Sequence, residues 1–294
     1  MKQIVVISGK GGTGKTIITA AFASLVKNKV MADCDVDAAD LHLLLNPKIL
    51  EKHEFKGGKT ANINNDKCNS CRKCLKVCRF DAIRETSPKS RYSKIIIDPI
   101  ACDGCGICSY VCPEDAITID ENIAGEWFIS DTRYGPFVHA KLGIAEENSG
   151  KLVTVVRQNA KLIAEKENRD FVIIDGSPGI GCPVISSISG ADFALIVTEP
   201  TLSGLHDMVR VIELASHFSV KTFVVINKYD LNTEMTEEIE KYCKMNGVAF
   251  AGKISYDPAV IKAMVDKKTV LESSNGKVTE QIKNVWRIIN NELR

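Results

Sequence analysis

The sequence predicts an α/β fold: a mostly parallel sheet covered by helices, with a small α+β module inserted into it. Two observations lead to this class. Short apolar strands alternate with helical patterns along most of the chain, and a glycine-rich loop follows the first strand. Eight of the eleven cysteines stand in two rows of identical spacing inside this alternation. We therefore expect one α/β domain at residues 1–58 and 122–294, interrupted by a cysteine-rich insertion at residues 59–121.

The N-terminal segment has the pattern of a strand–loop–helix–strand unit. Residues 2–7 form an apolar strand, and residues 9–14 form a loop rich in glycine. Residues 15–26 have the apolar spacing of a helix, and a second buried strand is expected at residues 30–32. This order predicts a βαβ unit that can bind a phosphate group at the helix N-terminus.

Alternation resumes after the cysteine rows and predicts the rest of the sheet. Strands are expected at residues 152–156, 171–174, 193–198, 223–226 and 249–254. Helices are expected at residues 160–167, 205–217, 234–246 and near 278–293. Such alternation is typical of a parallel sheet with helices on both faces. Gly57 and Gly58 indicate a linker before the insertion.

Composition limits the kinds of protein that fit. Lys and Arg total 38 against 37 Asp and Glu, so no bulk charge favours nucleic acid or a membrane surface. No apolar run approaches the length of a membrane span, and the first residues lack the features of a signal peptide. We expect a cytoplasmic protein whose cysteines bind metal rather than form disulfides.

The glycine-rich loop is a complete phosphate-binding motif. It reads Gly9-Lys10-Gly11-Gly12-Thr13-Gly14-Lys15-Thr16 and lies between a strand and a helix. The glycines let backbone N–H groups converge on phosphate oxygens. Lys15 is expected to neutralise β- and γ-phosphate charge, and the Thr16 hydroxyl to ligate Mg²⁺. The motif therefore predicts a P-loop NTPase that binds ATP or ADP with Mg²⁺.

Lys10, directly after the first glycine, is unusual for such a loop and marks a deviant Walker A motif. With it the chain resembles the MinD/ParA/Mrp and nitrogenase iron-protein superfamily of ATPases, also described as CobQ/CobB/MinD/ParA nucleotide-binding proteins. The resemblance implies that Lys10 reaches the nucleotide of a facing subunit, so that a homodimer encloses ATP. The alternative is a solvated loop lysine.

The same resemblance implies roles for residues at three strand ends. Asp35, and after it Asp33, lie where the family places switch I, and Asp35 would position the attacking water. Asp175 would be the Walker B aspartate that supports Mg²⁺ and leads into switch II, and Asn227 would contact adenine. The alternatives are an aspartate that caps a helix, for switch I, and an ordinary turn residue, for Asn227.

The two cysteine rows have the spacing of bacterial ferredoxins, C-x₂-C-x₂-C-x₃-C. Resemblance to two-cluster ferredoxins implies two [4Fe–4S] clusters, each taking its fourth ligand from the other row. One ligand set is then Cys68, Cys71, Cys74 and Cys112, and the other is Cys102, Cys105, Cys108 and Cys78. Zinc binding by paired CxxC elements is disfavoured by the third cysteine and the x₃-Cys ending. Basic residues surround the first row, which predicts a higher reduction potential for the first cluster. The alternative is that these are solvated surface charges with little effect on the potential.

Three further features are candidates for metal or partner contact. Cys182 lies seven residues after Asp175, and a similarly placed cysteine in the nitrogenase iron protein binds a bridging cluster. The second cysteine of that site has no clear equivalent, although His139 or a partner group could substitute. A buried, unliganded cysteine is the alternative. The polar segments 131–139 and 146–151 are expected to be loops that contact a partner, or else solvated connections.

Together these observations predict an ATPase whose nucleotide-driven dimer switching gates electron transfer through two [4Fe–4S] clusters to a partner protein. The alternative is an Mrp-like carrier that assembles or delivers an iron–sulfur or other metal centre. A MinD-type positioning ATPase with a redox sensor is a weaker alternative, because the C-terminal helix lacks a strongly basic amphipathic face. Expected partners are a second copy of the chain and a redox or metal-cofactor protein, without nucleic acid or stable membrane insertion.

Overall fold

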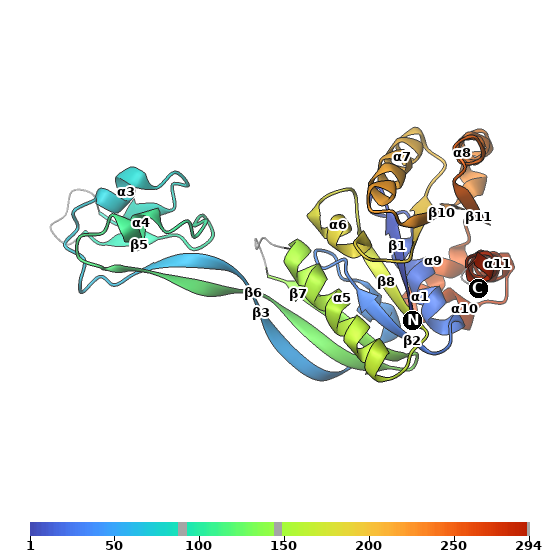
Figure 1. The fold of residues 1–294 in the computed structure, drawn as a ribbon, viewed down its shortest axis with the longest axis horizontal. Helices are drawn as coiled ribbons and strands as arrows, with labels where there is room; N and C mark the ends of the chain where they lie inside the picture. The colour runs from blue at the N-terminus through green and yellow to red at the C-terminus, as the bar shows by residue number, and fades with distance from the viewer. Residues whose placement is uncertain (88–92, 144–148, 293–294) are drawn as a thin grey trace. The chain divides into compact units, whose positions relative to one another are not determined.

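The chain divides into two compact units. A computed structural model describes residues 1–87, 93–143 and 149–292 (Figure 1). The first unit comprises Met1–His53, Trp127–Lys141 and Ser149–Arg294, and the second comprises Glu54–Glu126 and Leu142–Asn148. The cysteine-rich insertion expected at residues 59–121 falls within the second unit.

A mostly parallel sheet forms the framework of the first unit. In the described residues its order is β11-β10-β9-β1-β8-β2-β7-β6-β3. All pairings from β11 across to β7 are parallel. The strands are β1 (Lys2–Ser8), β2 (Lys29–Asp33), β3 (Lys48–Ile63), β6 (Ile117–Thr132), β7 (Gly135–Leu142), β8 (Phe171–Pro178), β9 (Phe193–Thr198), β10 (Lys221–Asn227) and β11 (Ala249–Ile254). The central strands are buried throughout because helices cover both faces.

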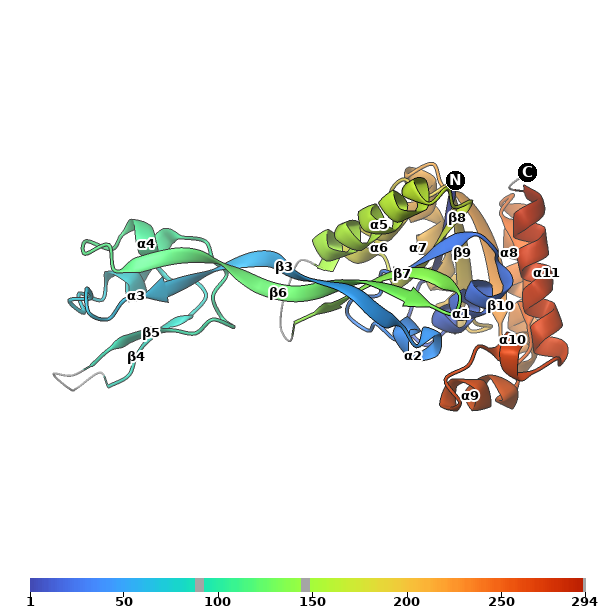
Figure 2. The same ribbon diagram turned by 90° about the horizontal axis from the view of Figure 1, so that it is seen from below.

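Helices lie on both faces of this sheet, as Figures 1 and 2 show. One face carries α5 (Ser149–Lys166), α6 (Cys182–Ile188) and α7 (Leu202–His217). The other packs against the main apolar core, which includes Phe22 and Ile282. Its helices are α1 (Lys15–Leu25), α2 (Leu41–Leu45), α9 (Pro258–Val265), α10 (Val270–Ser273) and α11 (Lys277–Glu292). Helix α8 (Thr233–Met245) contacts β11, and a 3₁₀ turn, η1, spans Tyr229–Leu231. None of the helices in the described ranges is long and apolar enough to cross a membrane.

The strand predicted at residues 152–156 is wrong, because this segment is part of helix α5. Its valines suggested a strand through their β propensity. The buried residues of α5 nevertheless recur with helical spacing, at Leu152, Val153, Val156, Arg157, Ala160 and Ala164. Tertiary packing of this face therefore decides the conformation, and the helix predicted from residue 160 begins at Ser149.

Two expected irregular segments are strands. Gly57 and Gly58 lie inside β3, where a Cβ on Gly57 would come within 2.8 Å of Ala124 Cβ in the neighbouring strand β6. These glycines allow close approach of two strands rather than forming a linker. Residues 131–139 form the end of β6, the turn and most of β7, in which Phe137 and Val138 are fully buried. Of the segment 146–151, residues 146–148 lie outside the described residues, and the remainder begins α5.

The second unit is small and has cysteine and isoleucine at its centre. It contains α3 (Lys73–Val77), α4 (Ile107–Tyr110) and an antiparallel pair of short strands, β4 (Ile83–Glu85) and β5 (Ile95–Ile97). Its buried cluster consists of Ala61, Cys74, Ile83, Ile95, Cys108 and Ile117. Four further cysteines, Cys68, Cys78, Cys102 and Cys112, pack against this cluster while partly exposed.

Candidate functional site

The glycine-rich loop connects β1 to α1, and its shape depends on two glycines. Gly14 caps α1 with a left-handed φ of 92°, and a Cβ there would lie 2.3 Å from the Asn227 amide nitrogen. A Cβ on Gly9 would lie 2.4 Å from Asp207 Cβ of α7. Larger residues at either position would displace the loop from the sheet edge, so both glycines are required sterically.

Lys15 stands at the centre of a group of buried carboxylates. Its side chain is 6% exposed, and its Nζ lies 2.8 Å from Asp35 Oδ2 and 3.6 Å from Asp175 Oδ1. Burial acts to lower the pKa of Lys15, but the charges of Asp175, Asp35 and Asp33 raise it overall. The lysine is therefore charged at neutral pH and held directly over the start of α1.

Asp33 and Asp35 are placed differently. Asp35 lines the large cavity beside the loop. Asp33 is fully buried, and its two carboxylate oxygens accept hydrogen bonds from the backbone N–H groups of Asp35 and Leu41. Burial and the nearby charge of Asp175 raise the pKa of Asp33 well above its usual range. Asp33 thus fixes the backbone of this segment, whereas Asp35 is available to a ligand.

Asp175 is a buried residue of β8. Its Oδ1 accepts a hydrogen bond from Thr19 Oγ1 at 3.0 Å, while its Oδ2 is buried and has no partner among the described residues. Burial raises the pKa of Asp175, opposed by the charge of Lys15. An orphaned carboxylate oxygen next to Thr16 fits a site for Mg²⁺ and its water ligands.

Lys10 is engaged within its own chain. Its Nζ lies 3.5 Å from Glu199 Oε2 and 3.3 Å from Ser203 Oγ. The other oxygen of Glu199 accepts from Lys228 Nζ at 2.6 Å. Glu199 follows β9 and is 17% exposed in its side chain. The Glu199 carboxylate therefore pairs with Lys10 of the phosphate-binding loop and with Lys228 after β10.

Asn227 lies at the end of β10, against the loop. Its amide nitrogen donates to the Thr13 carbonyl at 2.8 Å, and its side chain lines the cavity beside Gly14. The cavity has an empty volume of about 1590 Å³, including the part open to solvent. Its far side is formed by residues that sequence reasoning missed, among them Ser255, Tyr256 and Asp257 after β11. Their position at the carboxyl end of a parallel strand was the available signal.

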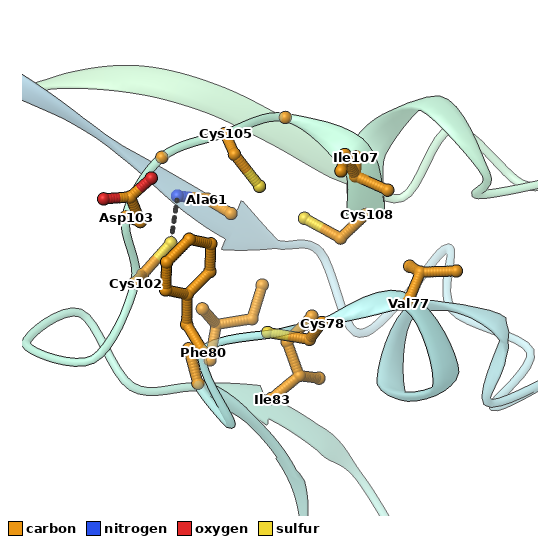
Figure 3. Close-up of a pocket in the computed structure, with 14 residues that line it drawn as sticks. Ala61, Val77, Cys78, Phe80, Ile83, Cys102, Asp103, Cys105, Ile107 and Cys108 are labelled. Carbon is orange, nitrogen blue, oxygen red and sulfur yellow. Dashed lines mark hydrogen bonds between the residues drawn. The ribbon is translucent and has the colours of Figure 1, made fainter.

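Four cysteines line one small cavity in the second unit. They are Cys78, Cys102, Cys105 and Cys108, three from the second row and one from the first. Figure 3 shows their sulfur atoms directed toward the space between them, with Phe80 and Ile107 alongside. Cys105 is exposed, whereas Cys108 is buried. The predicted second ligand set is thus brought together around one cavity.

The remaining four cysteines of the rows line another cavity in the same unit. These are Cys68, Cys71, Cys74 and Cys112, joined there by Asn69, Arg72, Lys73 and Glu114. Cys71 is exposed and Cys74 is buried, as Cys105 and Cys108 are in the other cavity. Each cavity is therefore lined by three cysteines of one row and the fourth cysteine of the other.

The backbone repeats in the same way as the cysteines. Corresponding residues of the two rows have positive φ in pairs: 58° and 68° at Ser70 and Gly104, 61° and 79° at Arg72 and Gly106, and 51° and 45° at Asp81 and Asp115. Left-handed backbone is costly for residues other than glycine, so its recurrence in both halves indicates one structural repeat.

Backbone N–H groups point at several cysteine sulfurs. Ala61 N donates to Cys102 Sγ at 3.4 Å, Ser70 N to Cys68 Sγ at 3.4 Å and Ala116 N to Cys112 Sγ at 3.3 Å. Among the residues that the structure describes, no three His, Cys, Asp or Glu side chains are grouped to hold a single metal ion. Ligands of a [4Fe–4S] cluster bind separate iron atoms around a cavity and need not converge on one point.

Cys182 and His139 differ in accessibility. Cys182 is exposed at the first residue of α6, directly after the segment that follows Asp175. His139 is buried in β7, stacked on Phe137 and hydrogen-bonded to Ser130. Burial lowers the pKa of His139 to about 4. His139 is therefore occupied within the sheet, and Cys182 alone remains available to a ligand.

Comparison with known proteins identifies the class that the fold and the nucleotide loop define. The family model for the CobQ/CobB/MinD/ParA nucleotide binding domain matches residues 4–270. The chain is 35% identical over 293 residues to the uncharacterized protein MJ0578 of Methanocaldococcus jannaschii, covering 97% of this chain and 95% of that protein. It is also similar to the septum site-determining protein MinD of Pyrococcus horikoshii, solved with Mg-ADP, with a TM-score of 0.59. That match is 16% identical and covers 99% of this chain and 97% of that chain.

The chain therefore belongs to the CobQ/CobB/MinD/ParA nucleotide-binding family, and its first unit has the fold of the MinD protein. The predicted α/β class and mostly parallel sheet are confirmed. A shorter similarity, 35% identity over 60 residues, relates 20% of the chain to 9% of the indolepyruvate oxidoreductase subunit IorA of Methanothermobacter marburgensis.

Proposed function

We propose that this protein is an ATPase in which nucleotide-driven dimer switching gates electron transfer through two [4Fe–4S] clusters to a partner protein. The observation that carries the proposal is the presence of two cavities, each lined by four cysteines in the exchanged arrangement, in a chain with a complete nucleotide loop. The short similarity to an oxidoreductase subunit supports a redox role.

The chain's own residues account for nucleotide binding and hydrolysis. Lys15 is charged and placed to neutralise phosphate oxygens, and the loop N–H groups supply further donors. Asp35 lines the cavity and is placed to orient a water molecule. Thr16 and Asp175 would hold Mg²⁺, directly and through its water ligands. When bound, Mg²⁺ would neutralise charge on the phosphates.

The donor set in the second unit fits iron–sulfur clusters. Thiolates are the ligands such clusters require, and the eight cysteines of the rows supply four at each cavity. The N–H groups of Ala61, Ser70 and Ala116 would stabilise negative charge on the sulfurs. When bound, each cluster would supply one-electron redox chemistry.

Dimer switching would depend on a change of contact by Lys10, from Glu199 of its own chain to the nucleotide of a facing subunit. In the present structure Lys10 contacts Glu199 of its own chain. To reach a nucleotide in a facing subunit, Lys10 must leave Glu199, and phosphate charge would offset the lost ion pair. Asp175 and Cys34 are linked through backbone and Ser177 contacts, so both switch segments would respond to the same nucleotide.

A carrier that delivers an iron–sulfur centre is the second candidate. Cys71, Cys105 and Cys182 are all exposed, which would allow a cluster or metal to be passed to an acceptor. A positioning role lacks comparable support, because the apolar face of α11 is buried in the core of the first unit.

Anaerobic reconstitution with iron counting and EPR, with and without ATP, tests the proposal. We expect about eight Fe per chain in every nucleotide state, and loss of one cluster signal in Cys112→Ser. Cys243→Ser, a buried cysteine of α8 outside both rows, is the matched control. Stoichiometric zinc or an iron-free chain would contradict the proposal, and ATP-dependent loss of iron to an acceptor would favour the carrier.

A further inference from the structure

The two halves of the cysteine unit present short helices at equivalent positions. Helix α3 follows exposed Cys71 and carries buried Cys74, and helix α4 follows exposed Cys105 and carries buried Cys108. Each helix is entered through a left-handed residue, as described above. Because the two backbones correspond, differences between their exposed side chains are not imposed by the fold.

Those exposed side chains differ completely in character. Four basic residues on and beside α3 are exposed, and we call them the α3 surface: Arg72, Lys73, Lys76 and Arg79. The equivalent positions around α4 are Gly106, Ile107, Tyr110 and Pro113, of which Tyr110 is 92% exposed. Basic side chains therefore lie on and beside the helix at one cysteine cavity, and uncharged residues occupy the equivalent positions at the other.

The charge difference extends along the sequence of both halves. Residues 67–94 contain nine Lys and Arg against two Asp and Glu, whereas residues 98–126 contain no Lys or Arg and seven Asp and Glu. Arg72 pairs with Glu85 at 2.9 Å. In the described part of the chain, Lys73, Lys76 and Arg79 have no ion-pair partner. These three charges are therefore free to attract an external anion.

We propose that the α3 surface is the docking site of a small acidic electron-carrier protein. This inference rests on the proposed function, because it requires a cluster at Cys68, Cys71, Cys74 and Cys112. One electron passes from the reduced carrier to the oxidised cluster, without transfer of a proton or an atom. Cys71 is exposed and lines the same cavity as Lys73, so a carrier on this surface lies against the cluster edge.

Charge complementarity explains why the carrier uses this surface and not α4. Attraction between opposite surface charges raises association rates by about 10- to 1000-fold at low salt, and the gain is lost as ions screen it. Screening is strong beyond about 10 Å at 0.1 M ionic strength. Ile107 and Tyr110 offer no such attraction, and the acidic residues of that half would repel an acidic carrier.

Stopped-flow reduction of the reconstituted protein by flavodoxin hydroquinone, an acidic carrier, tests this assignment. We expect the second-order rate constant to fall at least tenfold between 20 and 500 mM NaCl, by the steering argument. The double variant Lys73→Glu/Lys76→Glu should lose about tenfold at low salt and show little salt dependence. The matched control is Lys241→Glu/Lys244→Glu, which makes the same charge change at two exposed lysines of α8.

Reduction by methyl viologen radical separates the possible failures. Equal iron contents in all variants show that the clusters are present. Because methyl viologen radical is a cation, it should reduce the charge-reversed α3 variant at least as fast as wild type when the clusters are competent. If they are, but flavodoxin reduces the α3 double variant and the control equally fast, the docking site is wrong. If wild type holds no iron, the proposed function itself fails. Should the charge-reversed variant lose iron, Lys73→Gln/Lys76→Gln provides the comparison, with an expected decrease of about threefold.

Discussion

Asp33 and Asp35 stand two residues apart, yet their carboxylates have different surroundings. Asp33 accepts two backbone N–H groups and is fully buried, while Asp35 pairs with Lys15 and lines the cavity. The spacing of the two aspartates in the sequence could not separate a structural from a catalytic carboxylate, because both follow the same strand. Burial and hydrogen bonding separate them in the structure.

Two amide substitutions test this assignment. Asp35→Asn should lower kcat for ATP hydrolysis by about 10²–10⁴-fold. It should destabilise the fold less than Asp33→Asn, because Asp175 still faces the Lys15 charge. Asp33→Asn should lower the free energy of unfolding by roughly 1–3 kcal/mol, because it alters a buried acceptor of two N–H groups. Steady-state hydrolysis and urea unfolding of both variants provide the measurement. A stable but inactive Asp33→Asn with an active Asp35→Asn would reverse the two roles.

Glu199 restrains Lys10 in the isolated chain, so its charge should oppose dimer formation. In Glu199→Gln the ion pairs to Lys10 and Lys228 are lost. We expect the ATP concentration that gives half-maximal dimer to fall about three- to tenfold, a coupling typical of such equilibria. Sedimentation velocity across an ATP series measures this shift.

Glu240→Gln is the control for Glu199→Gln, since Glu240 pairs with Lys253 and does not contact the nucleotide loop. Lys10→Ala should abolish the ATP-dependent dimer altogether. Suppose that Glu199→Gln dimerises at the same ATP concentrations as wild type, while Lys10→Ala does not dimerise. The Glu199 contact would then not limit dimerisation.

At the level of elements, the tip of the β6–β7 hairpin joins parts of the first unit that are distant in sequence. Arg133 forms an ion pair with Glu272 at 3.0 Å and donates to the carbonyls of Leu44 and Leu45. Burial acts to raise the pKa of Glu272, but hydrogen bonds from Arg133, Tyr134 and the Thr269 N–H lower it to about 2. The hairpin is thus anchored to both α2 and α10.

The lowered pKa of Glu272 predicts a dependence of stability on acid. Because the unfolded carboxyl titrates near 4.5, its contribution is fully present above that pH. It is lost as the pH falls toward 2, since the unfolded state then binds the proton more readily. Glu272→Gln should cost roughly 1–2 kcal/mol at pH 6 after allowance for partial exposure. Urea unfolding followed by Trp286 fluorescence should show this difference shrinking between pH 5 and 3; a constant difference would contradict it.

Strands and helices were predicted correctly where the apolar pattern of the sequence determines them. The prediction failed where tertiary packing determines the conformation. The strands at 171–174, 193–198 and 223–226 are almost wholly buried, and their apolar runs already indicated this. The strand at 249–254 is only partly buried. Leu152–Val156 has the same composition but lies on one helical face of α5. The polar hairpin at 131–139 was missed because Arg133 and His139 find buried or paired positions that composition does not reveal.

At the scale of the whole chain, the site residues that belong to local motifs could be predicted from the sequence. Those that reach the site through long-range contacts could not. The loop residues 9–16 and the eight row cysteines follow from spacing, because each motif is contiguous or repeated. Glu199 and Tyr256 reach the nucleotide cavity region only through the order of parallel strands. The grouping of charges around the cysteines also depends on the fold, since Glu114 follows the second row but lines the first cavity.

This regrouping bears on the last prediction, the order of the two reduction potentials. The first cavity is lined by Arg72, Lys73 and Glu114, and the second by Asp103 alone among charged residues in the described part of the unit. Net positive surroundings stabilise the reduced, more negative cluster. Glu114 reduces this difference but does not reverse it. We therefore expect the first cluster to have the higher potential, by on the order of 50 mV for surface charges at this range.

An EPR-monitored redox titration can assign the two potentials through variants of the neighbouring charges. Glu114→Gln should raise the potential of the first cluster and widen the separation, because it removes the acidic side chain that lines that cavity among the described residues. Asp103→Asn should raise the second potential and narrow the separation. The signal of the second cluster is the one lost in Cys105→Ser. If Glu114→Gln instead shifted the potential of that cluster, Glu114 would act on the second row, which it follows in the sequence, and not on the first cavity.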